Sequence, residues 1–401
     1  MLGRVVSPTG RALDGKGPVG TVGTRRLDTH GLRQSTPAMV RRAREGPWVL
    51  TGVRHLDLFH PIRRGLKVAV TGGKHDQQVQ LAAEVIGSLA AQNQGLRAVR
   101  GFSARVLAQQ GDVPPAALDG DENAIYYDDN GVNVFVWVTT NHSQKHLDAV
   151  VAHLERVGAM SSATVIAADS GSAPALQHQA LLAGVCLAAW YRSVGAHCTL
   201  VIDDMASHAQ SLGALLQVNA QPHPHSIAAV QAAALEPVCT PEVSDAPTPM
   251  RSLLDMLEMD GESAPGSITA LLLSAPLALE AGLKERRHQL WMQNLLGMAD
   301  HTITLSTELS QAGLWPPIEL TQHGATLKYQ PPVLARLAQR LTRLFSESRD
   351  AATRLRMGQE LGISLDWDVE EVVEWRAKAQ LLLAQSPGEF VPIHIQYLSL
   401  F

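Results

Sequence analysis

The sequence predicts an α/β protein with a mostly parallel sheet flanked by helices, followed by a C-terminal helical domain. Short apolar runs, each typical of a strand buried on both faces, alternate with longer stretches of helical spacing. Such alternation favours parallel pairing, because the crossover between two parallel strands usually carries a helix. After residue 331 the apolar spacing becomes almost wholly helical, which indicates a separate helical domain.

The individual elements follow from these runs. The expected strands cover residues 67–71, 133–139, 164–168 and 198–203, with further strand-like runs between 271 and 305. The expected helices cover residues 77–92, 143–157 and 176–193. Two polar segments interrupt the pattern, residues 99–131 and 221–266, and both are expected to lie on the surface.

The length of 401 residues favours more than one domain. We predict an N-terminal connecting segment at 1–47, an α/β domain at 48–330 and the helical domain at 331–401. The net charge of -5 gives no overall positive field, so nucleic acid is not an expected partner. The longest apolar stretch, residues 180–191, is too short to cross a bilayer, so no direct membrane insertion is expected. The 3 cysteines are too few and scattered for a disulfide framework or a zinc site, which favours a reducing compartment.

Two carboxylates, Asp203 and Asp204, end the strand CTLVIDD. The carboxyl edge of a parallel sheet is where such folds bind ligands, and in P-loop folds a carboxylate there holds magnesium through water. The alternative is that an aspartate caps the following helix, which Asp favours. The motif alone leaves the two interpretations about even.

The segment VAVTGGKHDQQVQLAAEV reads as a strand, a glycine-rich turn and a helix, the setting of a phosphate-binding loop. An intact loop has the pattern GxxxxGK[ST], in which the lysine reaches the terminal phosphates and the hydroxyl binds magnesium. Counting from Gly72 through Gly73 and Lys74, the second glycine falls on Gln77, the lysine on Gln78 and the hydroxyl on Val79. The position is that of a phosphate loop, but the residues predict a degenerate one.

Two histidine pairs raise the question of a metal. His142 and His146 stand at the start of a predicted helix, and His223 and His225 flank a proline. Neither pair has a third ligand at suitable spacing along the chain, so solvated histidines are the favoured interpretation.

The order of segments resembles the alpha subunit of F-type, proton-translocating ATP synthases. Short matches occur in order along nearly the whole chain, at residues 3–19, 51–65, 158–192, 301–320, 349–353 and 390–393. VIDDMASHA matches the magnesium-site strand and the helix after it. The family's N-terminal β-barrel has no counterpart, so the chain is expected to start after it.

The resemblance implies a RecA-like P-loop NTPase domain that binds ATP or ADP with Mg²⁺, in a ring with beta subunits around a gamma stalk. Catalysis in that family lies at beta, and alpha lends an arginine finger worth about three to five orders of magnitude in rate. Here the finger position falls on Thr326 and a neighbouring family serine on His323. Two smaller departures are Ala189 and Thr140, where the family has glutamate and glutamine.

Two hypotheses follow. The first is an alpha-type subunit that docks beside beta and gamma with a structural or regulatory role, as a peripheral complex on the cytoplasmic side of the bacterial inner membrane. The second is a pseudo-ATPase paralogue, regulatory or relic, that acts outside the synthase and is free in the cytoplasm. In neither is the chain alone expected to make or hydrolyse ATP.

Overall fold

The structure is a computed structural model that describes separate stretches of the chain. The described residues are 1–19, 48–109, 132–169, 171–208, 211, 266–274, 297, 299–319, 342–343, 345–348, 374–375, 378–381 and 383–391, with backbone alone for 94–109 and 141–142. No helix among these residues is long and apolar enough to cross a membrane.

The centre of the protein is a sheet of 7 strands in the order β1-β6-β5-β7-β8-β4-β9, and every pairing in it is parallel. Its strands are β1 (Arg4–Val6), β4 (Lys67–Gly72), β5 (Asn133–His142), β6 (Ala163–Asp169), β7 (His197–Asp203), β8 (Ser267–Ser274) and β9 (His301–Leu305). A small antiparallel pair, β2 (Trp48–Val49) and β3 (Ile62–Arg63), flanks the short helix α2 (Arg54–Phe59).

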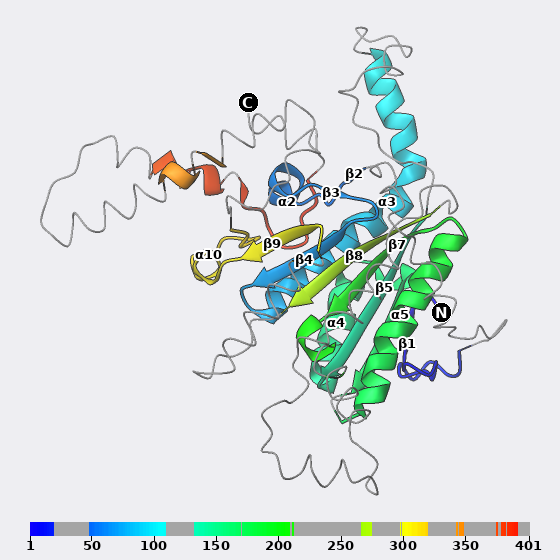
Figure 1. The fold of residues 1–401 in the computed structure, drawn as a ribbon. Coiled ribbons are helices and arrows are strands. Elements are labelled where there is room, and N and C mark those ends of the chain that lie inside the picture. Colours follow the sequence, from blue (N-terminus) through cyan, green and yellow to red (C-terminus); the bar gives the residue numbers. More distant parts are fainter. Residues whose placement is uncertain are drawn as a thin grey trace, which may run out of the picture.

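Helices cover both faces of the sheet (Figure 1). The helices α3 (His75–Gln109) and α4 (Gln144–Arg156) pack on one face, and α5 (Pro174–Ser193) packs on the other. Alternate residues of each strand serve the two layers: Trp137 of β5 faces α3 and α4, while Val136 and Val138 face α5. This two-residue period explains why the strands read as continuous apolar runs. The remaining named elements are η2 (Met160–Ser162) and α10 (Thr307–Gln311).

The predicted α/β class is confirmed, and the strands and helices expected between residues 67 and 203 all occur, with ends that agree to within a few residues except at the end of α3. The largest shift is in α3, which begins at His75 and extends to Gln109, into the predicted insertion at 99–131. The N-terminal segment contributes β1, which pairs with β6 at the edge of the sheet. The excursion at 221–266 lies outside the described residues, except for its last residue.

Most of the predicted C-terminal helical domain also lies outside the described residues. The described part of it includes helical residues at 345–348 and 378–381. A later segment, residues 383–391, contacts the sheet domain through hydrogen bonds of both its backbone and its side chains. Gln385 accepts a hydrogen bond from the backbone N–H of Arg54 at 2.9 Å, and Val391 N–H donates to the Gly52 carbonyl at 3.0 Å. The carboxylate of Glu84, on α3, accepts from the indole of Trp315 at 2.9 Å and from Gly388 N–H at 3.2 Å. The bonds to Gly52 and Arg54 hold the segment beside the start of α2, and the bond from Gly388 holds it against α3.

Three buried histidines lie beside one another between α2 and β9. His60 Nδ1 lies 3.1 Å from His301 Nε2, and the His55 and His60 rings stack with centroids 5.9 Å apart. Burial lowers the pKa of His55 and of His301 to about 4. Burial, together with the charges of its two neighbours, also holds the pKa of His60 well below its ordinary value. All three are therefore neutral in the folded protein at neutral pH.

This histidine cluster predicts a loss of stability on mild acidification. An unfolded histidine takes up its proton near pH 6.5, whereas folded His55 and His301 resist protonation until about pH 4. The unfolded state thus binds more protons in this window, so the free energy of unfolding falls as pH falls from 6.5 toward 4. The expected slope is on the order of 1 kcal/mol per pH unit for each histidine. Urea unfolding at pH 7, 6 and 5 measures it.

The His55→Leu variant is the matched test of that slope, because it removes one titrating group from an apolar position. Its stability should depend less steeply on pH than that of the unaltered chain, whatever its stability at pH 7. Identical slopes in the two proteins would contradict the assignment.

Candidate functional site

Three structural elements bring polar side chains together at the carboxyl edge of the sheet. Asp203 is the last residue of β7, His75 opens α3 directly after β4, and His146 lies in the first turn of α4 directly after β5. Since β5 and β8 flank β7 and β4 lies beyond β8, the two helices begin on either side of Asp203. Parallel α/β sheets bind ligands at this edge.

The strand register fixes the position of Asp203. All 7 residues of β7 are buried, and the strand pairs with β5 so that Asp203 lies opposite Thr139. A shift by one residue would turn the apolar residues of β7 to the wrong layers, so the core holds the carboxylate in place. The side chain of Asp203 has 0% exposure.

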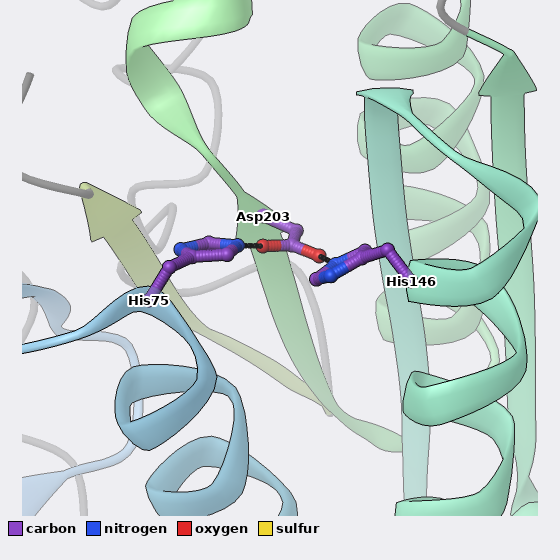
Figure 2. A group of neighbouring side chains, drawn as sticks. All are labelled: His75, His146 and Asp203. Carbon is purple, nitrogen blue, oxygen red and sulfur yellow. Dashed lines mark hydrogen bonds and ion pairs between the residues drawn. The ribbon is translucent and has the colours of Figure 1, made fainter. Parts of the chain in front are cut away.

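Asp203 bridges the two histidines, as Figure 2 shows. Its Oδ1 lies 2.8 Å from His75 Nε2, and its Oδ2 lies 2.8 Å from His146 Nε2. The indole Nε1 of Trp137 donates a further hydrogen bond to Oδ2 at 3.3 Å. A buried carboxylate is costly unless it is paired and hydrogen-bonded, and these three groups supply that compensation.

The electrostatic surroundings of the cluster favour an ionised Asp203. The positive ends of the α3 and α4 dipoles both lie near it, because His75 and His146 belong to the first turns of those helices. Burial alone would lower the pKa of His75, but its hydrogen bond with Asp203, reinforced by the charges of Asp203, Asp204 and Asp76, outweighs burial and raises that pKa above its ordinary value.

Asp204 takes a different role from Asp203. Its backbone is in the left-handed region, with φ 55, and its carboxylate accepts a hydrogen bond from the Ser207 hydroxyl. The Ser207 and His208 N–H groups donate to its backbone carbonyl. Asp204 thus lies at the start of the following helical turn, with its carboxylate bonded to a hydroxyl, whereas the carboxylate of Asp203 contacts the histidines.

The glycine-rich turn after β4 is tight. Only Gly73 and Lys74 separate the end of β4 from the start of α3, and both Gly72 and Gly73 have positive φ, 74 and 60. A Cβ on Gly72 would come within 2.4 Å of the Leu305 carbonyl oxygen on β9. The turn thus needs glycine for its conformation and for its close approach to the neighbouring strand.

The side chain of Gln77 folds back over this turn. Its Oε1 accepts a hydrogen bond from Lys74 N–H at 3.0 Å, and its Nε2 donates to the Ser310 hydroxyl after β9. Backbone N–H groups in such a turn are the ones that cradle phosphate in an intact loop. Here the amide oxygen of Gln77 already occupies one of them.

Gln78 and Val79 face the interior. Gln78 is 0% exposed, and its Nε2 donates to the carbonyls of Gly72 at 2.7 Å and of Ser274 at 2.9 Å. These two bonds tie the ends of β4 and β8 to α3. Val79 is buried in the core between the sheet and α3. Lys74 is exposed.

The structure corrects the sequence interpretation of His146. It is not a solvated histidine without a third ligand: its imidazole is 14% exposed and lies with Asp203 and His75 in one cluster. Sequence reasoning missed His75 altogether, although its place in the glycine-rich turn was a usable signal. His223, His225, His323 and Thr326 lie outside the described residues, as does the side chain of His142.

The two smaller departures from the family pattern can be placed. Thr140, on β5, is buried with its hydroxyl 3.4 Å from a ring nitrogen of His208. Ala189 lies on α5, where it packs against the core layer between that helix and the sheet. Neither residue joins the cluster at Asp203.

Comparisons with known proteins agree with this architecture. Residues 52–223 match the nucleotide-binding domain of the ATP synthase alpha/beta family. The chain is 27% identical over 368 residues to "ATP synthase subunit alpha 1" of Hahella chejuensis, a match covering 90% of this chain and 61% of that protein. It is 29% identical over 209 residues to "ATP synthase subunit alpha" of Dehalococcoides mccartyi, covering 52% of this chain and 33% of that one.

These matches confirm the predicted resemblance to ATP synthase alpha subunits, at low identity. The chain spans 61% or less of the length of these relatives. The three residues of the Asp203 cluster all lie within the stretch that matches this nucleotide-binding domain, residues 52–223.

Gln78 is predicted to stabilise the turn as a structural residue. Gln78→Leu replaces the side chain by an apolar one of similar size, and it leaves the carbonyls of Gly72 and Ser274 without their donor. The loss should lower the free energy of unfolding by about 1–3 kcal/mol. Urea unfolding should show that loss, whereas Lys74→Ala, at an exposed position in the same turn, should change stability by less than about 0.5 kcal/mol. Equal stabilities for Gln78→Leu and the unaltered chain would contradict the role.

Proposed function

We propose that this chain is a non-catalytic, alpha-type subunit that assembles beside beta and gamma subunits of a proton-translocating ATP synthase and has a structural or regulatory role. Support for the assembly comes from the match of residues 52–223 to the alpha/beta nucleotide-binding domain and from relatives named as alpha subunits. Support for a non-catalytic role comes from the glycine-rich turn, where the side chains of Gln77 and Gln78 make hydrogen bonds to the backbone.

The closed turn leaves little for a triphosphate to bind. At the position of the second glycine, Gln77 places its amide oxygen on Lys74 N–H, which a phosphate oxygen would need. At the position of the lysine, Gln78 is neutral and buried, with its amide nitrogen bonded to two carbonyls. At the position of the hydroxyl, Val79 offers no ligand to magnesium. We infer that these residues do not fit Mg²⁺-ATP or Mg²⁺-ADP held as an intact loop holds it.

Asp203 also differs from a magnesium residue of the usual kind. A carboxylate that holds hydrated magnesium accepts hydrogen bonds from the metal's waters. Both oxygens of Asp203 lie 2.8 Å from imidazole nitrogens instead. The two histidines thus take the positions around the carboxylate that such waters need. We infer that the chain contributes its fold and surface to an assembly, and no phosphate chemistry.

The second candidate is a pseudo-ATPase paralogue that acts outside the synthase as a regulatory module. The joint replacement of the loop lysine by Gln78 and of the finger arginine by Thr326 favours it, because either loss alone leaves one contribution of an alpha subunit in place. In the first case the chain is a peripheral member of a hexameric complex at the cytoplasmic side of the inner membrane. In the second it is free in the cytoplasm.

Nucleotide binding tests the closed turn. The unaltered chain is expected to show no saturable binding of Mg²⁺-ATP by calorimetry. A variant with Gln77→Gly, Gln78→Lys and Val79→Thr restores the GxxxxGK[ST] pattern and is expected to bind at least about tenfold more tightly, because the lysine and the freed N–H groups then reach phosphate.

The matched control carries Gln77→Gly and Val79→Thr but keeps Gln78. It opens the turn without adding the lysine and should bind less than the triple variant. Tight binding by the unaltered chain, with no gain in the triple variant, would overturn the non-catalytic interpretation of the turn.

Affinity purification of the tagged chain from its own cells decides between the two candidates. Recovery of beta and gamma subunits in stoichiometric amounts, identified by mass spectrometry, is the result expected for the alpha-type subunit. Recovery of the chain alone, or with unrelated proteins, would contradict that proposal and favour the pseudo-ATPase paralogue. The control is the same tag on a chain whose β7 core is disrupted by Leu200→Asp, which should recover neither subunit.

A further inference from the structure

We propose that His75, His146 and Asp203 form a binding site for a divalent transition-metal ion, of which Zn²⁺ is the representative. The inference rests on the geometry of this chain's own residues and is independent of whether the chain assembles with other subunits.

The first argument is the convergence of ligand atoms. The three residues come from three separate segments, and one ligand atom from each lies within 4.8 Å of the other two. Ligands at 2.0–2.1 Å from a tetrahedral zinc ion lie about 3.3 Å apart. The two contacts of Asp203 are already shorter than that, at 2.8 Å. Rotation of the imidazoles away from the carboxylate would open these two contacts to that spacing.

The second argument is the chemical character of the donors. Two imidazoles with one carboxylate suit zinc, cobalt, nickel or ferrous iron, whereas magnesium prefers oxygen ligands throughout and retains several waters. This donor set therefore discriminates against the metal that accompanies nucleotides. Three protein ligands also leave at least one coordination position open, which is the pattern of a reactive rather than a purely structural zinc site.

The third argument is the surroundings of the ligands. Trp137 Nε1 donates to Asp203 Oδ2 at 3.3 Å, and such outer hydrogen bonds orient ligating carboxylates. The carboxylates of Asp204 and Asp76 lie near enough to act electrostatically on His75, so the local field favours a cation. The side chains of His75 and His146 are 18% and 14% exposed, which lets an ion enter from the solvent at the sheet edge.

The competing explanation is that Asp203 bridges the two histidines for structural reasons alone. In that case the two imidazoles compensate the buried carboxylate, and the three side chains bind no ion. The two explanations differ in a measurable way, because only a metal site binds zinc in a defined stoichiometry that depends on both histidines.

The experiment titrates the full chain, stripped with a chelator, with Zn²⁺ in a calorimeter and with Co²⁺ in a spectrophotometer. We expect one zinc ion per chain and visible Co²⁺ absorption bands, with Mg²⁺ giving neither binding nor competition. His75→Gln and His146→Gln should each weaken zinc binding by more than about tenfold, since loss of a ligand costs at least as much as loss of an outer-shell partner.

The matched control is His153→Gln, which removes a histidine from α4 outside the cluster, where its ring contacts Arg156 at 2.7 Å. It should bind zinc as the unaltered chain does. Circular dichroism establishes that each variant is folded, and His75→Cys provides a second variant that keeps a zinc ligand and should retain binding where His75→Gln loses it.

Three results would overturn the proposal. These are no zinc binding by the unaltered chain, zinc binding that His75→Gln and His146→Gln leave unchanged, and Mg²⁺ binding at the same residues with equal affinity. Each of them would leave the cluster as a structural bridge or as a magnesium site.

Discussion

The buried carboxylate of Asp203 is the constraint around which the functional edge of this protein is organised. Its strand, β7, is buried along its whole length and continues directly into Asp203. An ionised group at such a position must be compensated by partners that the fold holds nearby. The compensation comes from the first turns of two helices and from an indole on β5, so β5, β7, α3 and α4 all meet at this one side chain.

The glycine-rich turn obeys a related constraint at the end of β4. An open phosphate loop leaves backbone N–H groups facing an anion, and without the anion they need other partners. In this chain Gln77 and Gln78 satisfy the turn from within, through their side-chain amides. The helix α3 consequently begins at His75, within the stretch that an open loop would occupy, and this early start directs His75 to Asp203.

The sequence predicted the parts of the structure that depend on local patterns. The strands β4, β5, β6 and β7 were recognisable because burial on both faces requires continuous apolar runs, and Gln77, Gln78 and Val79 could be placed by counting from Gly72. The cluster could not be found in this way. His75 and His146 stand far apart in the sequence, and only the order β5-β7-β8-β4 brings the helices that follow β4 and β5 to either side of Asp203.

The distribution of charge at this edge of the sheet favours a small cation over a phosphate chain. A phosphate chain needs cationic side chains or N–H donors. The turn has one exposed lysine, Lys74, but the position of the phosphate-binding lysine holds Gln78. The carboxylates of Asp76, Asp203 and Asp204 instead surround His75 with negative charge. A small cation would be attracted to this arrangement of carboxylates, whereas the negative charge of a triphosphate would be repelled by it.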